Sequence, residues 1–143
     1  MQRRFTLFLI IALLALALLA ACGGDSPTSS SALPGFVQGA PQTVQQAYQF
    51  AVANPDVLAH QPCYCGCGSM GHISNLDCYV QQVDDDGTVV YDNHAAGCGI
   101  CVDITQDVMR LLDEGRSQLE IRQYIDGQYS PFGPSTDTPL PAA

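Results

Sequence analysis

The stretch PCYCGCGSMGH, residues 62–72, places three cysteines at alternate positions, Cys63, Cys65 and Cys67, within a glycine-rich loop. Alternate residues of an extended chain point to the same side, so the three thiols face one region of space. Their Cα atoms lie near the upper separation limit for a disulfide, which disfavours bridges within the trio. The loop therefore predicts either a thiolate metal site or three distant cysteine partners that converge on it.

The N-terminal segment has the features of an export signal that ends in a lipid anchor. Arg3 and Arg4 precede an apolar run over residues 5–21, and Cys22 follows. A basic start and a short apolar run are typical of a signal peptide. The small residues before Cys22 resemble a bacterial lipobox, with cleavage before this cysteine and lipid on its thiol. We expect a signal over residues 1–21 and a mature protein at the extracytoplasmic face of the cell membrane; an uncleaved anchor helix is the alternative.

Two segments of low complexity flank the expected domain. Residues 22–42 are rich in Gly, Ser and Pro and lack an apolar period, which is typical of a flexible tether. Residues 130–143 have a similar composition and predict a disordered tail. The folded domain is therefore expected over residues 43–129. A domain of this size buries a modest share of its surface and often needs disulfides or a metal ion for stability.

The charge of the mature chain limits its partners. The sequence has no lysine, and once the signal is removed three arginines face fourteen acidic residues. Such an acidic surface repels the phosphates of nucleic acids and the headgroups of anionic lipids. We therefore expect no nucleic-acid partner, contact with the membrane through the lipid anchor, and cations as small partners. Another protein of the cell envelope is a further partner that the sequence leaves open.

Apolar periodicity and turn residues predict a small, mainly helical single domain with a short β-hairpin. A first helix is expected from a capping box at Thr43, and Pro55 opens a short second helix. Asp-Gly at residues 86–87, between two β-favouring runs, predicts the hairpin. Two further helices follow, and the second begins with a capping box at Ser117 and ends at Gly127. The residues predicted to face the core are Val44, Ala47, Tyr48 and Ala51 on the first helix and Val102, Ile104, Val108, Leu111 and Leu112 on the third.

Six cysteines of the domain, with two nearby histidines, have the residue types and the spacing of a metal site. Glycines in the loop permit the chain to wrap with its thiols inward. A fourth thiolate or an imidazole then completes a tetrahedral set for Zn(II), or a set of lower coordination for Cu(I). One metal cluster and two separate sites are both open. The candidate ligands are Cys63, Cys65, Cys67, Cys78, Cys98, Cys101, His72 and His94.

Two other functions of these cysteines remain open. Six cysteines in a small exported domain are also typical of three structural disulfides, which would stabilise an interaction domain. Cys98 and Cys101 form a C-x-x-C motif at the expected start of a helix, where the helix dipole lowers a thiol pKa. This pair predicts thiol–disulfide exchange, in which one cysteine attacks a mixed disulfide and the other resolves it. The sequence shows no Ser-His-Asp order, so an oxidoreductase is the only enzyme class that it suggests.

Several short motifs, in order along the chain, resemble the PCYCGC-motif family of bacterial lipoproteins. They include PCYCGCG at residues 62–68, SNLDC at 74–78, CGIC at 98–101 and EIRQYID at 120–126. The resemblance covers about residues 44–129. It implies an exported, lipid-anchored protein and brings no known activity.

A second resemblance concerns the C-terminal helices alone. The stretch LLDEGRSQLEIRQYIDGQY, residues 111–129, is similar to the last two helices of the cytochrome c maturation thiol-oxidoreductase family. That similarity implies the handling of protein thiols by one cysteine pair. This domain departs from the family because it carries six cysteines.

Overall fold

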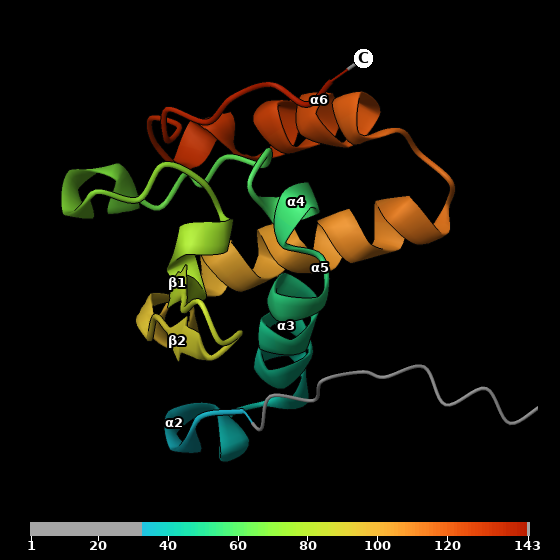
Figure 1. Ribbon diagram of the computed structural model, residues 1–143. Coiled ribbons are helices and arrows are strands. Elements are labelled where there is room, and N and C mark those ends of the chain that lie inside the picture. Colours follow the sequence, from blue (N-terminus) through green and yellow to red (C-terminus); the bar gives the residue numbers. More distant parts are fainter. Residues whose placement is uncertain (1–32, 143) are drawn as a thin grey trace, which may run out of the picture. The chain divides into compact units, whose positions relative to one another are not determined.

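The computed structural model describes residues 33–142, and the elements below belong to that part of the chain (Figure 1). The predicted signal peptide and Cys22 lie outside the described residues. The α-helices are α2 (Gly35–Gln38), α3 (Gln42–Ala53), α4 (Pro55–Leu58), α5 (Gly99–Asp113) and α6 (Gln118–Tyr129), the strands are β1 (Val80–Val83) and β2 (Val89–Tyr91), and the 3₁₀ turns are η1 (Cys67–Met70), η2 (Leu76–Cys78), η3 (His94–Gly97) and η4 (Ser130–Phe132). The mainly helical domain with a two-stranded antiparallel hairpin that the sequence predicts is confirmed.

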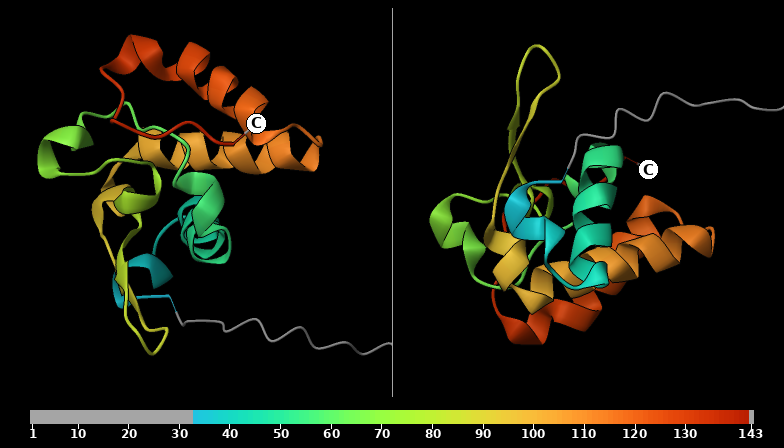
Figure 2. Two further views of the ribbon diagram at one scale, coloured as in Figure 1. Left: turned by 45° about the horizontal axis from the view of Figure 1, so that its top comes forward. Right: turned by 90° about the horizontal axis from the view of Figure 1, so that it is seen from below.

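Helix α5 is the centre of the core. It packs against α3 and α6, and α6 runs beside it while α3 crosses it steeply (Figures 1 and 2). The predicted apolar faces of α3 and α5 are buried, except that Leu112 is half-buried. Each fully buried Val or Ile side chain contributes about 1.5–3 kcal/mol, so these faces hold the three helices together. Within residues 33–142, no helix combines the length and the apolar character needed to cross a membrane.

Local turn residues set most helix boundaries as predicted. Pro55 occupies the first turn of α4, where its missing N–H costs nothing. Gly115 follows the C-cap of α5 with φ of 76°, the left-handed conformation that ends a helix. The Ser117 hydroxyl accepts a hydrogen bond from the N–H of Glu120, and the Glu120 carboxylate accepts one from the N–H of Ser117. The predicted capping box of α6 is therefore confirmed.

Two predicted boundaries were wrong. Helix α3 begins at Gln42 with Pro41 as its N-cap, and Thr43 makes no capping hydrogen bond. Helix α6 continues through Gly127 to Tyr129. The Tyr129 side chain is buried, and this packing outweighs the cost of about 1 kcal/mol for a glycine inside a helix.

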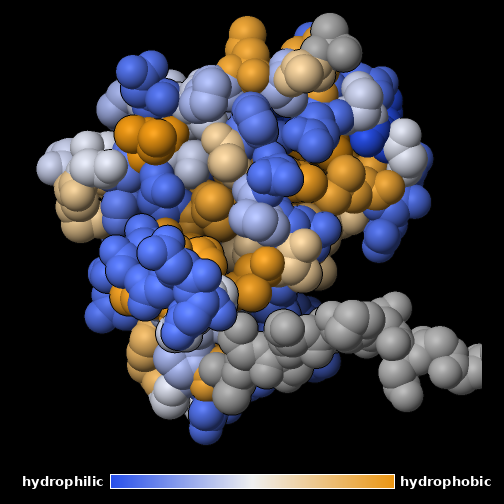
Figure 3. Space-filling view, viewed as in Figure 1, coloured by the Kyte–Doolittle hydropathy of each residue, from blue (hydrophilic) through white to orange (hydrophobic). Residues whose placement is uncertain are grey.

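The β-hairpin positions the residues that follow it. Val83 pairs with Val89 and Val80 with Tyr91, with an irregularity before Gln82. The turn uses Gly87 at φ of 85°, and the hairpin extends away from the helices (Figure 2). In Figure 3 hydrophilic side chains cover the hairpin, and hydrophobic ones are scattered over the same face of the molecule. The chain leaves β2 and turns at once into η3.

The C-terminal segment differs from the disordered tail predicted over residues 130–143. Residues 130–132 form η4, and residues 133–142, called the C-terminal strap below, run back over the domain in an extended conformation (Figures 1 and 2). The Thr136 N–H donates to the Cys63 carbonyl and the Cys63 N–H donates to Thr136 Oγ1, both at 2.9 Å. Composition predicts disorder because the strap has few apolar residues, but hydrogen bonds to the backbone dock it.

The domain also begins before the predicted boundary at residue 43. Part of the expected tether over residues 22–42 forms α2, whose Val37 is completely buried. Helix α2 packs against α3, and Phe36 meets the edge of Tyr48 with ring centroids 5.9 Å apart. A single buried valine in a polar stretch has no periodicity, so the sequence pattern does not reveal this helix.

Candidate metal centre

Residues 62–71, called the cysteine loop below, turn their thiols toward the core. Cys63 and Cys67 are buried and Cys65 is half-buried. The sulphurs of Cys63 and Cys65 lie 3.4 Å apart. Gly66 adopts φ of 86°, and this left-handed turn directs the chain back so that Cys67 points inward. Gly71 at φ of 94° closes the loop, as the glycine content predicted.

The start of α5 brings two more thiols to this loop. Cys98 is the N-cap residue and Cys101 lies in the first turn. The Cys101 sulphur lies 3.4 Å from that of Cys63 and 3.6 Å from that of Cys65. Helix α5 thus presents its first turn directly to the alternating cysteines.

His94 reaches the cluster from η3, directly after the hairpin. Its Nε2 atom lies 3.2 Å from the sulphur of Cys65. The N–H of His94 donates to Asp92 Oδ1 at 2.7 Å, and the Tyr48 hydroxyl donates to the Asp92 carbonyl at 2.7 Å. These bonds fix the start of η3 against α3. The His94 ring meets His72 edge to face, with 5.3 Å between the ring centroids.

His72 and Cys78 join the cluster from the segment that links the cysteine loop to β1. The Cys78 sulphur lies 3.5 Å from His72 Nδ1 and 3.7 Å from the sulphur of Cys67. The Asp77 carboxylate accepts two backbone N–H groups of the preceding turn, which folds Cys78 back toward the loop. The other ring nitrogen of His72 lies 3.9 Å from Asp92 Oδ2. Metal-binding histidines commonly donate their second ring N–H to a carboxylate; Asp92 lies on that side of the His72 ring, beyond hydrogen-bond distance.

All eight ligands predicted from the sequence therefore lie in one cluster, where the cysteine loop, η2, η3 and the start of α5 meet. Their donor atoms form overlapping groups, and within each group all donors lie within 4.8 Å of one another, which is a spacing that can hold a metal ion. A tetrahedral thiolate site with bonds of about 2.3 Å needs sulphurs about 3.8 Å apart. The groups are Cys65–His94–Cys98–Cys101, Cys63–Cys65–Cys67, Cys63–Cys78–Cys101 and Cys67–His72–Cys78. Among residues 33–142 all six cysteines are free thiols.

A buried polar network fixes the first turn of α5 behind the cluster. The Tyr79 hydroxyl donates to the Cys101 carbonyl at 2.8 Å, and Asn75 Nδ2 donates to the same carbonyl at 3.3 Å. The Thr105 hydroxyl donates to Asn75 Oδ1 at 2.7 Å. All three side chains are buried. Because the members of this network satisfy one another, they hold η2 and α5 in a single arrangement. The sequence motifs do not predict the network.

Hydrogen bonds inside the cluster separate the pKa values of the thiols. Hydrogen bonds from Cys101 and Cys78 hold the pKa of the Cys63 thiol far below its ordinary value. The bond to Cys63 raises the pKa of Cys101, and the bond to Cys101 raises the pKa of Cys78. Of the cluster thiols, Cys63 is the one whose pKa is lowered most. A metal cation offsets the repulsion among further thiolates, because it stabilises every thiolate around it.

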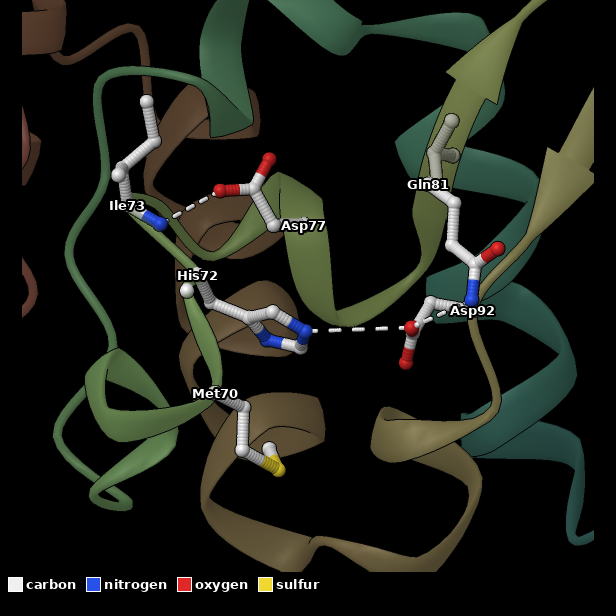
Figure 4. A pocket seen from close by; sticks show the side chains of 8 residues that line it. Met70, His72, Ile73, Asp77, Gln81 and Asp92 are labelled. Carbon is white, nitrogen blue, oxygen red and sulfur yellow. Dashed lines mark hydrogen bonds and ion pairs between the residues drawn. The ribbon is translucent and has the colours of Figure 1, made fainter.

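A surface pocket of about 440 Å³ opens beside the His72 end of the cluster (Figure 4). Met70, Asp77, Gln81 and Asp92 line it together with His72. Among the pocket residues, His72 is the one that also belongs to the cluster. The sequence pattern does not predict this pocket, because its walls come from the cysteine loop and the hairpin, which are distant in the chain.

Helix α6 holds the C-terminal strap against the cysteine loop. Arg122 is only 9% exposed, and its Nε donates to both oxygens of Asp126 at 3.0 Å. Arg122 Nη1 donates to the carbonyls of His60 and Thr138. The Tyr64 hydroxyl donates to Asp126 at 2.6 Å. A guanidinium this buried needs such partners, so the strap and the loop are fixed together.

The fold and the cluster define a small helical domain whose cysteines and histidines converge on one potential metal centre. Residues 12–141 match the model of a family described as a protein of unknown function with PCYCGC motif. The chain therefore belongs to this family, as the motifs predicted. No curated protein and no solved structure matches the chain. The similarity to the cytochrome c maturation family stays a prediction.

Proposed function

We propose that this protein binds a soft transition metal, Cu(I) or Zn(II), through the Cys/His cluster. The observation that carries the proposal is the convergence of six sulphurs and two imidazoles from four separate segments. Thiolate and imidazole are the ligands that Zn(II) and Cu(I) prefer, whereas Mg²⁺ and Ca²⁺ prefer oxygen. Three structural disulfides would instead need the sulphurs joined in pairs, whereas all six cysteines among residues 33–142 are free thiols.

The number of donors favours two ions in one cluster. A four-coordinate ion uses four donors, and Cys65, His94, Cys98 and Cys101 already form one such set. The set around Cys67, His72 and Cys78 has three donors, and the Cys63 sulphur is grouped with Cys67 and, separately, with Cys78. Cys63 therefore completes four donors for the second ion, and its sulphur, 3.4 Å from those of Cys65 and Cys101, brings the two sets into contact.

The proposed place of action is the extracytoplasmic face of the cell membrane, with the lipid on Cys22 as the anchor. The lipobox-like residues before Cys22 support the anchor, and the acidic mature chain supports the attraction of cations. In this position the protein handles metal ions outside the cytoplasm. The intact mass of membrane-extracted protein tests the anchor, because lipidation at Cys22 adds acyl chains after loss of residues 1–21.

The metal proposal is tested on the full-length chain, purified in detergent without air. Native mass spectrometry, metal analysis and a count of free thiols are measured on the same sample. We expect two copper or zinc ions per chain, which leave after acidification, and no disulfide. A metal-free protein six hydrogens lighter than the reduced chain would show three disulfides instead, and the metal proposal would fail.

The histidines provide a matched pair of variants for this test. His94 contacts Cys65 in the cluster, whereas His60 lies outside it, with Nδ1 near the Asp56 carbonyl. We expect His94→Ala to lower affinity for the metal by at least about tenfold, which corresponds to 1.4 kcal/mol. His60→Ala should bind as the wild type does. Equal affinities for the two variants would contradict the ligand role of His94.

Thiol–disulfide exchange is the second candidate function, and one contact favours it. The Cys101 sulphur lies 3.4 Å from that of Cys63, a contact outside the C-x-x-C motif. Cys63 is also the cysteine whose pKa is lowered most. An exchange reaction would therefore join Cys63 to Cys101. Turnover of a disulfide substrate by metal-free protein, with loss of turnover in Cys63→Ser and retention in Cys98→Ser, would support this function.

A further inference from the structure

The pocket beside the cluster has an unusual set of side chains for a water-exposed surface. A thioether, an imidazole and two carboxylates line it, from Met70, His72, Asp77 and Asp92, and no Lys or Arg is among its lining residues. In Figure 4 the Met70 side chain and the His72 ring extend into the same space, and Asp92 faces the ring from the hairpin side. The pocket therefore attracts cations and offers both a soft sulphur and a nitrogen ligand.

His72 connects this pocket to the buried thiols. Its Nδ1 lies 3.5 Å from the Cys78 sulphur inside the cluster, and its Nε2 lies 3.9 Å from Asp92 Oδ2 on the pocket side. The His72 side chain is 13% exposed, so the ring forms the wall between the two spaces. An ion bound to His72 Nε2 in the pocket is therefore separated from the Cys78 thiol by the imidazole ring alone.

Met70 is exposed in a way that packing does not explain. Its residue exposure is 57%, as is that of Ile73 on the same pocket, although both are apolar. Burial of a methionine in the core would gain about 1.5–3 kcal/mol, which this site forgoes. A thioether is a neutral, soft donor that suits Cu(I), whereas Zn(II) sites use thiolate, imidazole and carboxylate. The Met70 thioether therefore favours Cu(I) over Zn(II) as the ion that this pocket binds.

We infer that the pocket is the receiving site for Cu(I), in which Met70 and His72 bind the incoming ion before it passes to the cluster. This inference rests on the proposed metal-binding function and names its cargo. The incoming Cu(I) exchanges a ligand of its carrier for the Met70 thioether and the His72 imidazole, with Asp92 close by as a negative charge. The bonds to the Met70 thioether and to His72 Nε2 then break as bonds to the Cys78 thiolate and to His72 Nδ1 form. The Cys78 thiol proton leaves to water, and the imidazole proton moves from Nδ1 to Nε2. Copper stays Cu(I) throughout, so no oxidant or reductant is consumed.

The test measures how fast the full-length, reduced chain takes Cu(I) from its coloured bis-bicinchoninate complex without air. Met70→Leu keeps the apolar volume and removes the sulphur, and Met109→Leu is the matched control, on α5 and outside the pocket. We expect Met70→Leu to slow copper uptake by about tenfold or more, the effect of losing one ligand from the rate-limiting complex. The final copper content should stay unchanged, and Met109→Leu should load at the wild-type rate.

Loading with Zn(II) from a coloured zinc chelate completes the test. Met70→Leu should take up zinc at the wild-type rate, because the thioether contributes little to Zn(II). If Met70→Leu loads copper as fast as the wild type, or slows zinc equally, the receiving role of Met70 is overturned while the metal cluster stands. If the wild-type chain takes up zinc and no Cu(I), the cargo named here is wrong. If it takes up neither metal, the proposed function itself fails.

Discussion

Cys63 is the residue on which the cluster depends most. It is completely buried, and its sulphur lies 3.4 Å from the sulphurs of both Cys65 and Cys101. Its backbone N–H and carbonyl are both bonded to Thr136 of the C-terminal strap. One residue therefore joins the thiol cluster to the most C-terminal part of the domain. The hydrogen bonds to Thr136 fix its main chain, and the contacts with Cys65 and Cys101 fix its sulphur.

Substitution of Cys63 tests whether its sulphur is the fourth ligand of the second ion. In Cys63→Ser the second position loses a ligand while the set of Cys65, His94, Cys98 and Cys101 is unchanged, so we expect one ion to remain under competition with a chelator. In Cys98→Ser the first position loses a ligand instead, and one ion should again remain; serine also replaces cysteine well as the N-cap of α5. Native mass spectrometry across a chelator titration measures both. Two ions bound to Cys63→Ser with wild-type affinity would contradict the ligand role of Cys63.

At the scale of elements, the site depends on how α5 is held against its neighbours. The first turn of α5 carries two ligands, and the Tyr79 hydroxyl bonds its Cys101 carbonyl from the segment after η2. On the opposite side, the Tyr48 ring packs edge to face against Tyr79 with 4.9 Å between the centroids. The first turn of α5 is thus held by Tyr79, which follows the candidate ligand Cys78, and Tyr79 is supported in turn by Tyr48 of α3.

The Tyr79 hydroxyl should contribute to both stability and metal binding. Tyr79→Phe leaves the buried Thr105 and Cys101 groups short of a partner, so we expect the free energy of unfolding to fall by about 1–3 kcal/mol. The affinity for the metal should fall as well, because the Cys101 carbonyl loses one of the hydrogen bonds that hold it in position. Tyr91→Phe is the control, since the Tyr91 hydroxyl makes no hydrogen bond within residues 33–142 and its ring is half-buried. Urea unfolding of the reduced chain measures the difference, and equal losses for the two variants would contradict the role of the network.

The C-terminal strap is predicted to protect the cysteine loop. Removal of residues 133–143 leaves the Cys63 N–H and carbonyl without Thr136, and the buried Arg122 loses the Thr138 carbonyl. We expect faster alkylation of Cys63 in the metal-free, reduced chain, measured by mass spectrometry of its peptides. Thr136→Val removes one acceptor and should cost about 1–3 kcal/mol. Ser135→Ala, an exposed change in the same strap, should stay within about 0.5 kcal/mol. Wild-type alkylation of the shortened chain would show that the strap does not protect the loop.

At the scale of the whole molecule, features encoded over short distances were predictable from the sequence. The apolar stripe of α3, the proline of α4, the Asp-Gly turn and the capping box of α6 each lie within a few residues, and the structure has all four. The convergence of the eight candidate ligands was also predictable, because thiols at alternate positions need partners and few other Cys or His residues exist.

The features that the sequence pattern does not reveal all depend on contacts between distant segments. The strap has few apolar residues, so its docking through Thr136 and Arg122 leaves no apolar pattern to detect. Met70 and Asp92 meet at one pocket only because the hairpin folds beside the cysteine loop. The Asn75–Tyr79–Thr105 network joins two elements in the same way. Spacing in the chain predicts the candidate ligands, whereas the pocket, the strap and the polar network around them can be recognised only in the folded structure.

Removal of the metal should lower the stability of the whole domain. The ligands come from the cysteine loop, η2, η3 and α5, so a bound ion links four segments that a small core holds only modestly. A ligand present at a thousand times its dissociation constant stabilises the folded state by about 4 kcal/mol. We therefore expect a chelator to lower the melting temperature of the full-length chain under reducing conditions, and metal binding to release protons because the thiols must ionise. Cys65→Ser provides the control, since it weakens one of the two sites and the chelator should therefore lower its melting temperature less than that of the wild type. An unchanged melting temperature in the wild type would show that the four segments are held by packing alone.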